Sequence, residues 1–206
     1  MKQKNKKIIA IVIIALIILA GIVVVSVWGF NKELRFAQSQ RIDIYTEQQV
    51  DETKVKNIAN EVLGSENMLQ TVEIYEDMVT IRAKSISEEQ RNNIVNKIKE
   101  SYEFEQTAET TDINTVPATR IRDMYKQYVL PFAISGALVV AYMVIRYHEK
   151  GTLKVLTRAV VVPVVAELLL LSIIAITRIP MGRFIPTLVI LMYIASILYV
   201  IKENEK

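Results

Sequence analysis

Residues 8–30 read IIAIVIIALIILAGIVVVSVWGF, a stretch of 23 residues without a charged side chain. An α-helix of that length spans about 35 Å, which exceeds the ~30 Å hydrocarbon core of a bilayer. A secretory signal peptide is the alternative, because lysines precede the stretch. The apolar length exceeds the usual ~7–15 residues of a signal core, and Trp28 and Phe30 end it without a small-residue cleavage site. The stretch therefore predicts a retained transmembrane helix.

Three further apolar runs follow in the C-terminal part of the chain, at residues 128–145, 159–176 and 184–201. Each run has about 18 residues, which gives ~27 Å of helix and just reaches across the hydrocarbon core. Pro180 and Gly182 between the last two runs predict a tight turn and an antiparallel helix pair. The sequence thus predicts a multi-pass membrane protein with four spans.

The charges are divided between two parts of the chain. Residues 31–127 carry 13 Lys and Arg and 18 Asp and Glu, a net charge of −5, whereas the other segments carry 12 basic and 4 acidic residues. Lys and Arg concentrate in the cytoplasmic parts of membrane proteins. We therefore expect cytoplasmic N- and C-termini and an extracytoplasmic position for residues 31–127. The basic balance indicates orientation in a lipid bilayer and no nucleic-acid partner.

Enzymatic chemistry has little support in the composition. The chain has no cysteine and one histidine, His148, so disulfides, thiol catalysis and a zinc site with three or four ligands are excluded. The acidic residues come without a serine motif or a glycine-rich phosphate loop. We expect no catalytic residue, no metal site and no cofactor, and we do not expect an enzyme.

The middle segment changes to the patterns of a water-soluble fold. Residues 41–45 alternate as in a strand, and Asp51 predicts the cap of a helix that stops at Gly64. Two more alternating runs, residues 71–75 and 78–84, predict a hairpin joined at the acidic pair between them. The first half of this segment therefore predicts strand, helix and two strands.

The second half adds a helix and a last strand. Ser87 and Gln90 match a capping box, and we expect a poorly defined strand between residues 104 and 113. The order β-α-β-β-α-β predicts a ferredoxin-like domain with two helices on one face of an antiparallel sheet. Its apolar stripes indicate core packing, and we expect the domain to contact a partner without transforming it. The predicted division is residues 1–30, 31–127 and 128–206.

Glu167 is the one acidic residue inside a predicted span. A carboxylate at mid-bilayer costs roughly 2.5–3.5 kcal/mol on insertion scales, so it should face other helices or be protonated. It could titrate, bind a partner, or donate one interhelical hydrogen bond as a protonated acid. Pro163, one turn earlier, removes the donor for the Ala159 carbonyl and predicts a local kink.

The second span carries small residues at a spacing that suits close helix packing, within the chain or against a partner. They are Ala133, Gly136, Ala137 and Ala141.

Three short motifs in the later spans, together with the order of spans and domain, resemble the SecF family, the smaller subunit of the SecD/SecF protein-export complex. That family has an aromatic and basic loop after its second span, where this chain has Arg146 and Tyr147. It has an acidic step within its third span and a polar motif that starts with tyrosine near the end of its fourth. The matching positions here are Ala166, Glu167 and Leu168 for the step, and Tyr193 for the tyrosine.

The resemblance implies a subunit in the bacterial cytoplasmic membrane that assists protein export with a SecD-like partner and the Sec translocase. It also implies that the outer domain engages the translocating polypeptide. The chain departs from the family where an asparagine–aspartate pair is replaced by Ser196 and Ile197, and it has four spans where the family has six. We therefore expect a shortened subunit that does not conduct protons alone. The alternative is a membrane-anchored extracytoplasmic interaction module without a transport role.

Overall fold

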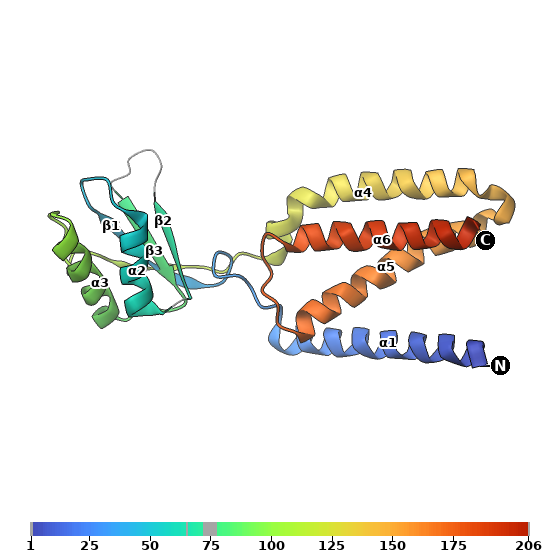
Figure 1. Cartoon of the computed structure of the whole chain (residues 1–206), viewed down its shortest axis with the longest axis horizontal. Coiled ribbons are helices and arrows are strands. Elements are labelled where there is room, and N and C mark those ends of the chain that lie inside the picture. The colour runs from blue at the N-terminus through green and yellow to red at the C-terminus, as the bar shows by residue number, and fades with distance from the viewer. Residues whose placement is uncertain (1, 65, 72–77, 206) are drawn as a thin grey trace. The chain divides into compact units, whose positions relative to one another are not determined.

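The computed structural model describes residues 2–64, 66–71 and 78–205. The chain divides into two compact units (Figure 1). One unit is Glu33–Arg120, and the other combines the N-terminal residues up to Lys32 with the segment from Ile121 onward.

The second of these units is a bundle of four helices. Its helices are α1 (Lys2–Trp28), α4 (Ile121–Arg146), α5 (Thr152–Ile176) and α6 (Ile185–Glu205), and the 3₁₀ turn η1 (His148–Lys150) joins α4 to α5. By length and composition all four can cross a membrane, which confirms the predicted membrane-spanning helices. The last three extend beyond the predicted apolar runs, because polar residues at the membrane margins continue each helix.

Helix α5 contacts each of the other three helices of the bundle. In Figure 1 it crosses obliquely between α1 and α6, and the N-terminal end of α1 lies at the same end of the bundle as the C-terminal end of α6. Many Ile, Leu and Val side chains on these helices are exposed. Such a continuous apolar surface suits lipid and would be a liability in water.

The turn between α5 and α6 is joined to the residues that follow α1. The Arg178 guanidinium donates to the Gly29 carbonyl at 2.6 Å, and Asn31 Nδ2 donates to the Arg178 carbonyl at 2.9 Å. The Met181 amide donates to the Asn31 carbonyl at 2.8 Å. Because the C-terminal end of a helix carries partial negative charge, Arg178 stabilises the end of α1.

The other unit is a four-stranded sheet with two helices. Its elements are β1 (Ser39–Tyr45), α2 (Glu52–Leu63), β2 (Asn67–Thr71), β3 (Met78–Ala83), α3 (Glu88–Ser101) and β4 (Ile113–Val116). The strand order is β2-β3-β1-β4, and every neighbouring pair is antiparallel. Ile42 opposes Ile81 across β1 and β3, and Ile113 across β1 and β4.

One face of the sheet packs against both helices to form the core. Ile42, Ile44 and Ile81 are fully buried there together with Val55 of α2 and Ile94 of α3. Each fully buried Ile or Val contributes roughly 1.5–3 kcal/mol relative to exposure. Alternation along β1 directs Ile42 and Ile44 to this face and Arg41 and Asp43 to the other.

The predicted helix caps are confirmed. Asp51 Oδ1 accepts from the Thr53 amide at 2.8 Å. The Ser87 hydroxyl accepts from the Gln90 amide at 3.1 Å, while Gln90 Oε1 accepts from the Ser87 amide at 2.9 Å.

Two predicted strand positions are wrong. Strand β2 begins at Asn67 and not at Thr71, and residues 72–75 of the prediction lie outside the described residues. The strand expected at 104–113 instead begins at its last residue, as β4. Asn67 resembles a turn residue in sequence, but its side chain donates to Asn60 Oδ1 at 2.8 Å and accepts from Lys56 Nζ at 2.7 Å. These bonds tie the start of β2 to α2.

Candidate functional site

Glu167 lies in the middle of α5, a helix that continues through Pro163. Both carboxyl oxygens of Glu167 are buried, and neither has a hydrogen-bond partner in the described part of the chain. The interhelical hydrogen bond considered from the sequence is therefore not formed with any described residue. An uncompensated buried polar group costs about 1–3 kcal/mol. This carboxyl group therefore lowers the stability of the bundle, and a function would explain why it is kept.

Tyr193 of α6 is a second polar group without a partner. Its hydroxyl is buried and makes no hydrogen bond to the described residues, while its ring packs on Phe132 of α4 with centroids 4.9 Å apart. Glu167 is nine residues before the end of α5, and Tyr193 is eight residues after the start of α6. At 1.5 Å per residue these are about 13 Å and 12 Å along antiparallel helices, so the two groups lie at similar depths.

The other motif positions near these residues are less unusual. Ser196 is buried, and its hydroxyl donates to the Tyr193 carbonyl at 2.7 Å. Ala166 is half-buried, and Leu168 is exposed. None of these three positions supplies a second acid or base to Glu167.

The small residues of α4 do not form one packing face within the chain. Ala133, Ala137 and Ala141 are exposed. A Cβ atom placed on Gly136 would lie 3.7 Å from the Tyr193 hydroxyl oxygen, an ordinary van der Waals contact.

The close helix approach is elsewhere, between α1 and α5. A Cβ atom placed on Gly21 would lie 2.3 Å from Ser172 Cβ and 2.6 Å from Ser172 Cα. Sequence reasoning missed this crossing, although a glycine inside a span is a known signal of close helix packing.

Arg146 and Tyr147 meet the end of α6. Tyr147 donates from its hydroxyl to Glu205 Oε1 at 3.3 Å, and Arg146 lies 3.8 Å from the same oxygen. Arg146 also donates to the Tyr142 hydroxyl, and its guanidinium lies 5.7 Å and 5.5 Å from the ring centroids of Tyr142 and Tyr147. Burial raises the pKa of Tyr147, so this hydroxyl remains a donor at neutral pH.

A neighbouring contact involves Arg158 of α5 and Asn204 of α6. Arg158 lies 3.4 Å from Asn204 Oδ1, and Asn204 is almost fully buried. Through Asn204 and Glu205, the C-terminal end of α6 thus contacts α5 at Arg158 and the end of α4 at Arg146 and Tyr147. Sequence reasoning missed these contacts, because Tyr142, Asn204 and Glu205 match no motif.

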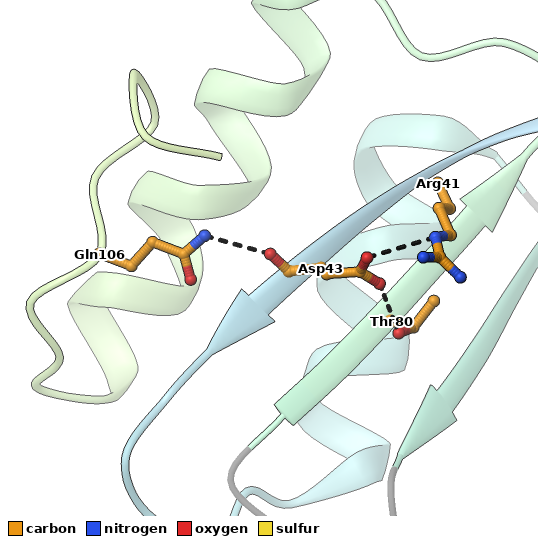
Figure 2. A network of polar contacts seen from close by, with 4 residues as sticks. All are labelled: Arg41, Asp43, Thr80 and Gln106. Carbon is orange, nitrogen blue, oxygen red and sulfur yellow. Dashed lines mark hydrogen bonds and ion pairs between the residues drawn. The ribbon is translucent and has the colours of Figure 1, made fainter. Parts of the chain in front are cut away.

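In the α/β unit, polar residues gather on the sheet face opposite the core (Figure 2). Asp43 Oδ1 accepts from the Thr80 hydroxyl at 2.7 Å, and Asp43 Oδ2 lies 3.2 Å from Arg41 Nε. Gln106, from the loop before β4, donates to the Asp43 carbonyl at 3.1 Å. Each of these four residues has a polar partner within the cluster. We therefore interpret the cluster as a structural feature of the sheet.

Across residues 2–64, 66–71 and 78–205, no group of three or more His, Asp and Glu side chains could hold a metal ion. Ser39 Oγ, Arg82 Nε and Asn204 Nδ2 are also buried without a partner among the described residues. Glu167 and Tyr193 are the two such residues that lie inside the predicted apolar runs, and they are the candidate site.

No family model matches the sequence, and no curated protein is significantly similar to it.

Proposed function

We propose that this chain is a SecF-like accessory subunit of protein export that acts with a SecD-like membrane protein and the Sec translocase. The order of one span, an α/β unit and three spans supports this assignment. The β-α-β-β-α-β order with strands arranged β2-β3-β1-β4 supports a ferredoxin-like fold for the α/β unit. In this proposal that unit lies outside the cytoplasm and engages the translocating polypeptide.

The observation that carries the proposal is the carboxyl group of Glu167. It is buried in the bundle without a partner among the described residues, and simple anchoring does not require an acid there. Intramembrane acids that persist at this energetic cost usually serve ion or partner coupling. Because one carboxyl cannot relay protons across ~30 Å of hydrocarbon, the coupling needs groups from a partner, and this subunit does not conduct protons alone.

The distribution of basic residues supports the orientation. Lys150 and Lys154 follow α4, and Lys202 lies near the end of α6. These positions share one end of the bundle with the lysine-rich N-terminus. The positive-inside tendency places that end in the cytoplasm.

The test is replacement of Glu167 by leucine in the native host, with secretion of a reporter protein as the readout. Leu168→Ala is the matched control, because it changes an exposed apolar neighbour. We expect Glu167→Leu to impair secretion as strongly as deletion of the gene, at an unchanged membrane level of the protein. Normal secretion in the Glu167→Leu strain would contradict coupled export.

A second experiment addresses the partners. Purification of the full chain in mild detergent should recover a larger SecD-like membrane protein and components of the translocase. If neither is recovered, the export assignment is wrong.

The second candidate is a membrane-anchored interaction module, and one observation favours it. The carboxyl of Glu167 is not hydrogen-bonded to any described residue, so the residues that the structure describes form no proton path through it. The module hypothesis predicts that Glu167→Leu leaves function intact, while replacement of residues 33–120 by a flexible linker abolishes it.

A further inference from the structure

An apolar groove of about 840 Å³ runs between α4 and α6. Tyr125, Phe132 and Ala133 line it from α4, and Val189, Ile194 and Leu198 line it from α6. Its volume is within the ~300–1,000 Å³ of small-molecule sites. Its walls are almost entirely hydrocarbon, so its occupant must be apolar over most of its length.

The length of the groove suits an acyl chain. From Ile185 to Leu198 the groove follows 14 residues of α6, about 20 Å, which is slightly more than one ~15 Å leaflet of the hydrocarbon core. Acyl chains are thin enough to enter it.

Two basic residues adjoin one end of the groove in sequence. Lys126 follows Tyr125, and Arg183 lies between Met181 and Ile185, and these three neighbours all line the groove. The Tyr125 hydroxyl donates to the Gly182 carbonyl at 3.2 Å, which brings their sequence neighbours Lys126 and Arg183 to the same end of the bundle. Both are exposed, and neither forms an ion pair with a described residue. The nearest acid in the α4 sequence, Asp123, is 3.5 Å from Arg122. This end is therefore positively charged.

We propose that the groove binds one anionic phospholipid from the leaflet at this end of the bundle. The acyl chains occupy the space between α4 and α6, and the phosphate is held by Lys126 and Arg183. Basic residues beside apolar gaps between helices are a general feature of sites for anionic lipids. The site is independent of the export assignment.

The first test uses the full-length protein, purified in detergent and stripped of lipid. Phosphatidylglycerol or phosphatidylcholine is then added in mixed micelles, and binding is measured by native mass spectrometry. We expect phosphatidylglycerol to bind about tenfold more tightly. The Lys126→Gln/Arg183→Gln variant should lose this preference, whereas Lys154→Gln, which removes a charge at the other end of the bundle, should keep it. Equal binding of both lipids to the unaltered protein would overturn the proposal.

The second test blocks the groove. Ala133→Trp places a bulky side chain in the groove from an exposed position, and Leu138→Trp does so on α4 outside the groove lining. Ala133→Trp should abolish phosphatidylglycerol binding with unchanged helix content, and Leu138→Trp should not. If Ala133→Trp instead separates a complex with a second membrane protein and leaves lipid binding unchanged, the groove holds a partner helix and the proposal is wrong.

Discussion

The two carboxyl oxygens of Glu167 are buried in an otherwise apolar part of the bundle, where they lower its stability. Its neighbours on α5 are aliphatic, and its two oxygens lack a partner among the described residues. The free energy required to bury the group is not returned by a hydrogen bond. If Glu167 couples export as proposed, stability and function make opposite demands at this position.

Replacement of Glu167 by leucine should stabilise the purified protein. Removal of an uncompensated buried carboxyl should add about 1–3 kcal/mol to the free energy of unfolding. The measurement is the thermal midpoint in detergent, with Leu168→Ala as the control. A lower midpoint for Glu167→Leu would indicate that the carboxyl has a stabilising partner.

The contact between Gly21 and Ser172 gives a second prediction for a single residue. An alanine at position 21 would place its Cβ 2.3 Å from Ser172 Cβ, so α1 must move away from α5. We expect Gly21→Ala to cost about 1–3 kcal/mol, as overpacking does. The control is Ala20→Leu, which adds more volume at an exposed neighbouring position. Equal thermal midpoints for the two variants would contradict the close crossing.

Residue patterns could predict some of the candidate site and not the rest. Glu167 stands out in the sequence because it is the single acid in the four predicted apolar runs. The unpaired Tyr193 hydroxyl and the Gly21–Ser172 contact depend on how helices distant in sequence pack, which one span's composition does not encode. The same is true of Tyr147 and Glu205, whose contact joins residues 58 positions apart.

At the scale of elements, prediction succeeded where the local signal is complete. Helices α2 and α3 have apolar stripes, and Asp51 and Ser87 cap them through side-chain bonds within three residues. It failed at β2 and β4, whose positions depend on distant partners. Gln106 explains the second failure, since its side chain provides hydrogen bonds that a longer β4 would have made.

The side chain of Gln106 forms hydrogen bonds with β1 at positions that β4 does not reach. Its amide group donates to the Asp43 carbonyl at 3.1 Å and accepts from the Tyr45 amide at 2.7 Å, as a neighbouring strand would. Substitution by leucine leaves the Tyr45 amide without this acceptor. We expect that amide to exchange hydrogen about tenfold faster, which corresponds to a loss of ~1.4 kcal/mol.

The measurement for Gln106→Leu is hydrogen exchange by mass spectrometry on the full chain. Glu105→Leu is the matched control, because Glu105 is an exposed neighbour in the same loop. Unchanged exchange at Tyr45 in Gln106→Leu would show that the side chain does not replace a strand there.

At the scale of the whole molecule, one chain forms two units that need different solvents. The bundle exposes aliphatic side chains along its helices, while the α/β unit buries its isoleucines and exposes charge. Lipid satisfies the first surface and water the second. In the sequence, the α/β unit lies between α1 and α4.

The side of the membrane on which that unit lies can be tested with single cysteines, because the chain has none of its own. Glu109→Cys marks the α/β unit, and Lys154→Cys marks the basic end of the bundle; both positions are exposed. The positive-inside tendency predicts that a membrane-impermeant maleimide labels Glu109→Cys in intact spheroplasts and Lys154→Cys only in inverted vesicles. The reverse pattern would place the α/β unit in the cytoplasm, where it could not meet a polypeptide emerging on the outer side, and the proposed role in export would fail with it.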